Sequence, residues 1–375
     1  MKNFFLFLFF LFFFLEAGSY LFTKLEIFHK YTIPTYSKLD SKGNYWRNEM
    51  HPGGAWHKVN SFSTHKERCI NTTYQSNDIG ARDNKDYLTL TNKTNTILLG
   101  DSFAEGYGVN IEDIFSKIIE KNLNINVLNL GTAGNFGPLQ EYLIYEHYKK
   151  ILSHQSVILF FLPANDFIEN DGRKIWGKRF RPYFYKNPNA ENKFEIFYPL
   201  DAIPSENYFP SGKAEYINKI ENILVNYTYS VNFLREIIFI INNYKKYNSF
   251  YTPNKKNVGY FFTDKYAIDG AIFYINEIAR DVRENEKDLT IVIIPTQEDI
   301  NQILSSNEEY RDFYWYKEMM NVGKKYKFEI IDLAAGQNSF LEKSIDWKNN
   351  FLSCDGHWSK EGHRTAAKKF IEYKK

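Results

Sequence analysis

Predicted strands and helices alternate along this 375-residue chain, and that alternation most constrains its fold. Short apolar runs predict strands at residues 96–100, 125–130, 156–162, 289–294 and 328–333. Apolar residues at helical spacing predict helices at residues 111–123, 139–152 and 310–326, and Ser359 is placed to cap a last helix that ends near Tyr373. This pattern favours a three-layer α/β/α architecture, in which a five-stranded parallel sheet is covered by helices on both faces.

Two segments depart from the alternation. Residues 25–90 are polar, rich in aromatic residues and turn signals, and we expect an irregular lead-in that packs on the domain formed by residues 91–375. Residues 167–288 are too long for a loop in a compact domain. We expect them to form an insertion with its own helices, the last of which rejoins the core before the strand at 289–294.

The first 24 residues indicate export. Lys2 precedes twelve consecutive Phe and Leu residues, at positions 4–15. A membrane span needs about 20 apolar residues, whereas this length matches the apolar region of a secretory signal. We favour an uncleaved signal anchor that extends toward Lys24; the alternative is a signal peptide cleaved near Ala17 or Ser19. Either interpretation places the rest of the chain outside the cytoplasm.

Charge and cysteine content limit the remaining possibilities. The formal net charge is +2, so no overall field favours a nucleic-acid partner. The chain has two cysteines, Cys69 and Cys354. In an exported chain they can form a disulfide, which would hold the loop before Asp355. The alternative, two separate buried thiols, is the one we favour from the sequence.

A candidate nucleophile follows the first predicted strand, in Gly100-Asp101-Ser102. A serine on a tight strand-to-helix turn is exposed at the sheet edge, and its own amide lies near a helix N-terminus, where negative charge is stabilised. Ala104 stands where the Gly-x-Ser-x-Gly pattern needs glycine, so that pattern fails. Taken alone, Ser102 is more simply explained as a helix cap.

A candidate base lies near the C-terminus, in Asp355-Gly356-His357. A neutral imidazole can accept a serine proton, and a nearby carboxylate fixes its tautomer and stabilises the imidazolium. His363 is the rival base, but it lies inside the last predicted helix and is less favoured.

Candidate oxyanion donors follow two further strands. Gly131, Gly134 and Gly137 come after the strand at 125–130, where glycines let backbone amides approach a substrate. Asn165 follows the strand at 156–162, and its side chain can donate a hydrogen bond to a developing negative charge. Each is more often structural when it occurs alone.

In this order, the four blocks resemble the SGNH/GDSL hydrolase family. The serine block matches at Ser102 and the glycine block at Gly134. The asparagine block matches at Asn165, with Pro163 where the family usually has glycine. The last block departs from the common spacing, because one residue rather than two separates its Asp from its His.

The resemblance implies a flavodoxin-like five-stranded sheet and acyl transfer without a metal or organic cofactor. Ser102 would attack an ester carbonyl, His357 would accept its proton, and Asp355 would orient His357. The amides of Ser102 and Gly134 and the side chain of Asn165 would hold the oxyanion. We expect hydrolysis of an acyl ester on an extracytoplasmic small molecule, carbohydrate or lipid.

Several alternatives remain beside hydrolysis. An O-acetyltransferase acting on an envelope or secreted polysaccharide would use the same serine chemistry, and an inactive SGNH-like domain could bind glycans.

A nucleotide enzyme is disfavoured because the glycines at 131–137 lack the Gly-x-Gly-x-x-Gly spacing. His51 and His57 could ligate a metal, but a structural role is more common for each. Exposed aromatic residues could stack on sugar rings, although a core role is more common for them; the candidates are Trp176, Tyr183 and Tyr185.

Overall fold

The computed structural model describes residues 2–25, 49–67, 69–90, 94–134, 136–173, 181–187, 194–198, 264–305, 311, 313–342, 346–352 and 355–375, together with parts of 223–238. Within these residues, five parallel strands form one sheet in the order β11-β10-β7-β5-β6. The strands are β5 (Asn95–Leu99), β6 (Asn126–Asn129), β7 (Ser156–Phe161), β10 (Asp288–Ile293) and β11 (Glu329–Asp332). Numbered along the chain, this order is 2-1-3-4-5, the flavodoxin-like order, so the predicted fold class is confirmed.

Helices cover both faces of this sheet. One face packs against α4 (Pro138–Tyr148), α9 (Lys265–Glu284) and α11 (Tyr314–Tyr326), and the other against α3 (Phe115–Leu123) and α12 (Lys360–Lys374). The strand side chains divide between the two cores by alternation: Ile97 and Leu99 join the first, and Leu98 joins the second. Ser359 caps α12 as expected, because its side chain accepts hydrogen bonds from the amides at the start of that helix.

The lead-in is more regular than its composition indicated. Its described residues form two antiparallel hairpins, β1 (Glu49–His51) with β2 (Gly54–Trp56), and β3 (Phe62–Glu67) with β4 (Ile70–Gln75). In β4 the buried Ile70, Thr72 and Tyr74 alternate with exposed polar residues. That alternation includes a single aliphatic residue, so it is easily overlooked in a polar stretch.

Cys69, in the turn between β3 and β4, is disulfide-bonded. The expectation of two separate buried thiols is therefore wrong for this residue. The only other cysteine in the sequence is Cys354, which lies outside the described residues.

The insertion adds a small hairpin and returns to the core through α9. Strand β8 (Tyr183–Lys186) pairs with β9 (Phe194–Phe197), and Phe184 packs beside Tyr274 of α9. Residues 229–234 are helical, which agrees with an insertion that has its own helices, although much of the insertion lies outside the described residues. Tyr183 is fully buried, so it belongs to the core; Tyr185 is exposed, and Trp176 lies outside the described residues.

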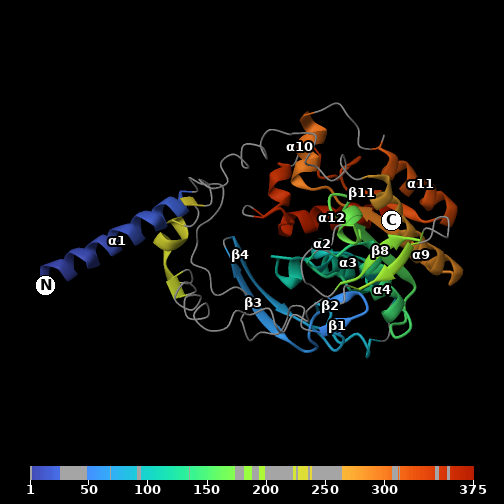
Figure 1. Cartoon of the computed structure of the whole chain (residues 1–375), viewed down its shortest axis with the longest axis horizontal. Coiled ribbons are helices and arrows are strands. Elements are labelled where there is room, and N and C mark those ends of the chain that lie inside the picture. The colour runs from blue at the N-terminus through green and yellow to red at the C-terminus, as the bar shows by residue number, and fades with distance from the viewer. Residues whose placement is uncertain are drawn as a thin grey trace.

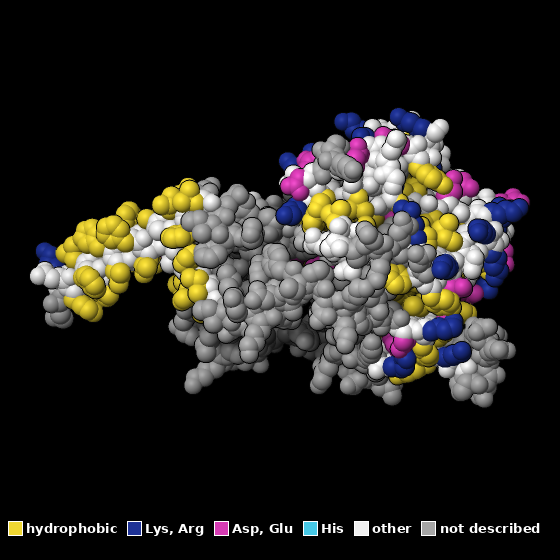
Figure 2. All heavy atoms as spheres, turned by 90° about the horizontal axis from the view of Figure 1, so that it is seen from above, with side chains coloured by type: hydrophobic (Ala, Val, Ile, Leu, Met, Phe, Trp, Pro, Cys, Tyr) yellow, Lys and Arg dark blue, Asp and Glu magenta, His cyan; other side chains and the backbone are white. Residues whose placement is uncertain are grey.

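The N-terminal helix α1 (Lys2–Lys24) extends away from the sheet domain (Figure 1), and its apolar side chains are exposed (Figure 2). Its segment Lys2–Phe22 is long and apolar enough to cross a membrane. The regular helix therefore continues beyond the twelve-residue Phe and Leu run. Glu16 interrupts the apolar surface, and its carboxylate accepts the amides of Tyr229 at 2.7 Å and Ser230 at 3.1 Å.

Candidate active site

The turn between β5 and α2 (Ser102–Glu105) presents the Ser102 hydroxyl at the carboxyl end of the first core strand. Gly100 has a φ of +147°, and a Cβ built there would lie 2.7 Å from the Cβ of Phe160 and 2.8 Å from that of Ala104. Only glycine fits this backbone without displacing its neighbours. Asp101 then caps α2, because its Oδ1 accepts the Phe103 amide at 2.9 Å.

The structure brings together the serine, histidine and aspartate that the sequence singled out. Nε2 of His357 lies 2.7 Å from Oγ of Ser102, and Nδ1 of His357 contacts Oδ1 of Asp355. The same Oδ1 accepts the backbone amide of His357 at 2.9 Å. The Asp355 carboxylate therefore binds both the backbone amide and the ring of His357. This explains how the carboxylate reaches the imidazole with a single residue between Asp355 and His357.

Aromatic packing fixes the loop that carries His357. Trp358 is fully buried, with its ring 5.1 Å from that of Phe103 and 5.3 Å from that of Phe340. The imidazole itself lies between Phe103 and Tyr107, at centroid distances of 5.1 and 4.5 Å. These contacts restrict the imidazole to the orientation that faces Ser102.

A cavity of about 430 Å³ opens at this point. The two predicted oxyanion residues, Gly134 and Asn165, line it together with Ser102 and His357. The remaining lining residues are Phe103, Tyr107, Ala133, Leu162, Ala164, Thr296, Glu298, Asp355 and Gly356. A substrate carbonyl placed here has a hydroxyl nucleophile and candidate hydrogen-bond donors on the same wall.

No family profile matches the sequence, and no curated protein matches it. Similar solved structures include a member of the lipolytic protein G-D-S-L family from Veillonella parvula, with 12% identity, a TM-score of 0.35, and coverage of 74% of this chain and 97% of that one. A GDSL-like lipase from Bacteroides thetaiotaomicron has 10% identity, a TM-score of 0.33, and coverage of 75% and 89%. A carbohydrate esterase family 2 enzyme from Corynascus has 9% identity, a TM-score of 0.36, and coverage of 83% and 71%.

The chain has a flavodoxin-like α/β fold, with five parallel strands in the order 2-1-3-4-5. Its parallel sheet has the expected strand order, and the site lies where ligands bind in such folds, beyond the carboxyl ends of the strands. What this fold does chemically depends on the side chains just described.

The other histidines that the sequence offered lie elsewhere in this fold. His363 is buried in α12, where its Nδ1 accepts the amide of Phe115 at 3.2 Å, and burial lowers its pKa to about 3. His51 stacks on Trp56, and burial lowers its pKa to about 3. The described residues contain no group of three or more potential metal ligands, and His57 faces Glu105 instead.

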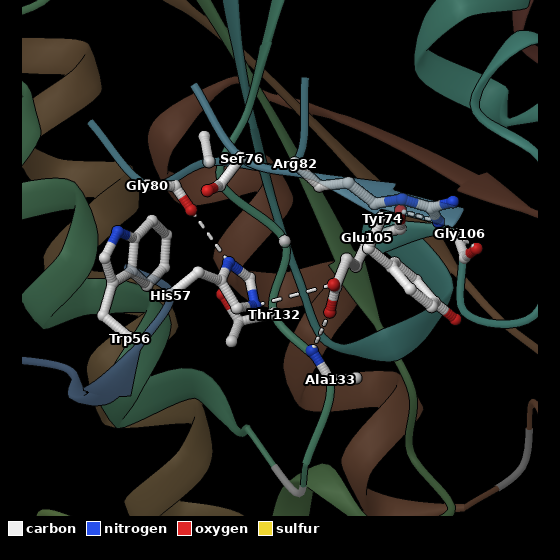
Figure 3. A network of polar contacts seen from close by, with 12 residues as sticks. Trp56, His57, Tyr74, Ser76, Gly80, Arg82, Glu105, Gly106, Thr132 and Ala133 are labelled. Carbon is white, nitrogen blue, oxygen red and sulfur yellow. Dashed lines mark hydrogen bonds and ion pairs between the residues drawn. The ribbon is translucent and has the colours of Figure 1, made fainter. Parts of the chain in front are cut away.

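Residues of the lead-in also surround the turn that carries Ser102, and no sequence pattern indicates them. Arg82 is fully buried, and its guanidinium donates to the carbonyls of Glu105 at 3.1 Å, Gly106, and Val109 at 2.6 Å (Figure 3). An isolated arginine in a polar segment carries no periodic signal. The sequence offers one indication that Glu105 is buried. The four-residue helix α2 lies between a buried strand and a glycine, which leaves Glu105 little access to solvent.

Three buried carboxyl groups lie behind the serine turn. Burial raises the pKa of Asp101 to about 6. Burial and the nearby Asp101 hold the pKa of Glu141 well above its usual value, and burial with Glu141 and Asp101 does the same for Asp166. Each of these carboxyls therefore has a higher pKa in the folded chain than in the unfolded chain.

This cluster predicts that stability falls as pH rises. The folded state holds more protons than the unfolded state above the ordinary carboxyl pKa of about 4. Stability is therefore complete below that pH and is lost as pH rises through about 6, the folded pKa of Asp101. We expect Glu141→Gln, which removes one of these charges, to raise the free energy of unfolding at about pH 8 by on the order of 1 to 3 kcal/mol.

Thermal unfolding between about pH 5 and pH 8 measures this effect. Glu146→Gln is the matched control, because Glu146 lies on the same helix but is half-exposed and pairs with Lys149. A Glu141→Gln protein with the same pH dependence as wild type would contradict the expectation.

Proposed function

We propose that this protein is a serine-dependent hydrolase of acyl esters that acts outside the cytoplasm on a carbohydrate or lipid ester. The observation that supports the proposal most directly is the 2.7 Å contact between Ser102 Oγ and His357 Nε2, with Asp355 on the opposite ring nitrogen. Nucleophile, base and orienting carboxylate at hydrogen-bonding distance form the arrangement that activates a serine hydroxyl.

In the first half-reaction, Ser102 Oγ attacks the ester carbonyl carbon while its proton passes to His357 Nε2. Asp355 accepts the hydrogen bond from Nδ1 and stabilises the imidazolium that forms. The carbonyl oxygen becomes an oxyanion, and we assign its stabilisation to the amides of Ser102 and Gly134 and the side chain of Asn165, three residues that line the cavity. His357 then returns the proton to the leaving alkoxide, and the acyl group remains on Ser102.

In the second half-reaction, water attacks the acyl carbonyl and gives its proton to His357. The new tetrahedral intermediate collapses, the carboxylic acid leaves, and Ser102 recovers its proton. An acceptor hydroxyl that replaced this water would produce acyl transfer with the same residues in the same roles.

Replacement of the serine or the histidine tests the mechanism. We expect Ser102→Ala and His357→Ala to lower kcat for p-nitrophenyl acetate by about 10³-fold or more, because residues of such a triad act as a unit. A fluorophosphonate should label wild type at Ser102 and leave Ser102→Ala unlabelled.

His363→Gln is the control, because His363 is a buried histidine that holds the amide of Phe115 and lies outside the cavity lining. This variant should keep its kcat even if it unfolds at a lower temperature. A folded wild-type protein that resists the fluorophosphonate would favour an inactive glycan-binding domain. Equal activity in wild type and Ser102→Ala would refute the nucleophile.

The acyl acceptor decides between hydrolase and transferase. We expect free acetate to accumulate when the protein is incubated with an activated acetyl ester and an oligosaccharide. Mass spectrometry of the oligosaccharide gives the decisive measurement. If the oligosaccharide gains about 42 mass units per acetyl group, and only when Ser102 is present, the reaction is O-acetyl transfer rather than hydrolysis.

We also propose that α1 remains attached as a membrane anchor. Its apolar side chains are exposed, as a lipid-facing helix requires, and the partly buried carboxylate of Glu16 is satisfied by the amides of Tyr229 and Ser230. The contact joins the helix to residues near 230 of the same chain, which favours retention over removal.

Membrane extraction tests the anchor. We expect the full-length protein to stay with membranes at alkaline pH and to be released by detergent, whereas a chain lacking residues 2–24 should be soluble. Intact-mass measurement of the exported protein is the second readout. A mass that lacks the first 17 to 19 residues would show cleavage and would overturn the proposed anchor.

A further inference from the structure

Two fully buried ionisable side chains lie behind residues 131–134, which we call the oxyanion loop. Neither side chain belongs to the proposed triad. Nε2 of His57 is 3.5 Å from Oε1 of Glu105, and both side chains have no solvent exposure. His57 comes from the lead-in, whereas Glu105 is the last residue of the helix that begins with Ser102. Burying such a pair is costly in free energy unless it makes specific contacts, so its partners matter.

The contacts of His57 define its tautomer. Its Nδ1 lies 2.9 Å from the carbonyl oxygen of Gly80, which can only accept, so Nδ1 carries a proton (Figure 3). Nε2 then faces Glu105.

The second oxygen of Glu105 holds the oxyanion loop. Its Oε2 accepts the amide of Ala133 at 2.5 Å (Figure 3). The two preceding amides are also bound inward, Gly131 to the Asn129 side chain at 3.0 Å and Thr132 to the Gly100 carbonyl at 3.1 Å. The residue that follows these three, Gly134, lines the cavity beside Ser102.

From this geometry we infer that Glu105, supported by His57, is a positioning residue for the oxyanion hole. One rigid four-residue helix carries the nucleophile at its first position and the carboxylate that fixes the oxyanion loop at its last. The distance between the attacking oxygen and the Gly134 amide is therefore set within a single unit of structure. This role rests on the proposed ester chemistry and adds to it a residue that does not touch the substrate.

Glu105→Ala tests the inference by removing the acceptor of the Ala133 amide. One oxyanion donor contributes about 10² to 10³ in kcat, so a donor that is present but poorly aimed should cost about 10- to 100-fold. We expect that loss in kcat for p-nitrophenyl acetate with KM nearly unchanged, because the oxyanion forms after substrate binds. The inhibition constant of a trifluoromethyl ketone, whose adduct places an oxyanion in the hole, should rise by the factor by which kcat/KM falls.

Two variants control for a purely structural effect. In Glu105→Gln, the amide oxygen can accept from Ala133 and the amide nitrogen can donate to His57 Nε2, so kcat should stay within about 3-fold of wild type. Glu120→Ala is the matched control, because Glu120 is also buried and also accepts a backbone amide, that of Val127 at 2.9 Å, near the start of β6. It should lower stability and leave both kcat and the inhibition constant of the ketone unchanged for the folded fraction.

Amide hydrogen exchange of residues 131–134 gives a readout that does not depend on activity. Exchange there should accelerate in Glu105→Ala and not in Glu120→Ala. Unchanged exchange, or turnover that falls only in proportion to the folded fraction, would overturn the positioning role. A wild-type protein that neither turns over esters nor reacts with a fluorophosphonate would instead refute the proposed function, while the exchange measurement would still decide whether Glu105 orders the loop.

Discussion

The hydrogen bond between Ser102 and His357 requires two remote parts of the chain to meet at one end of a parallel sheet. The sheet positions Ser102, because β5 ends at Leu99 and the next residue, Gly100, turns the chain toward Ser102. Trp358 positions His357, because it anchors the C-terminal loop against the side chain of Phe103, the neighbour of Ser102. Ser102 and His357 are thus fixed to the same small group of packed aromatic rings.

The lead-in is part of this arrangement, even though it precedes every strand of the sheet. Arg82 binds the carbonyl groups where α2 ends, and His57, which also comes from the lead-in, faces Glu105. Tyr74 of the second hairpin lies beneath the Arg82 guanidinium, with the charge 4.2 Å from the ring centre. The serine turn is therefore held between the sheet on one side and the lead-in on the other.

Strand and helix patterns predicted the core well because they depend on local periodicity. The continuous apolar run at 156–162 and the amphipathic spacing near 314–326 each reflect burial that the fold then provides. Ser102, Asp355 and His357 could be singled out because serine chemistry requires these residue types in loops after strands. Their meeting in space could only be expected through the resemblance to a family.

Contacts that join the lead-in to the site could not be predicted in this way. Arg82 and His57 are single polar residues among many, and nothing local distinguishes a buried arginine from an exposed one. The hairpin at 62–75 was missed because only alternate positions are buried, and most of those are polar. The state of Cys69 depends on a partner remote in sequence, which spacing alone does not determine.

The sequence separation within the site also affects when it can form. Ser102 and His357 are 255 positions apart, and the loop that carries the histidine lies close to the end of the chain. Contacts between such distant segments form late in folding, because a long stretch of chain must be ordered first. During synthesis, the Ser102 hydroxyl therefore emerges 255 positions before the His357 imidazole that it contacts, and the contact forms only after the strands and helices between them are ordered.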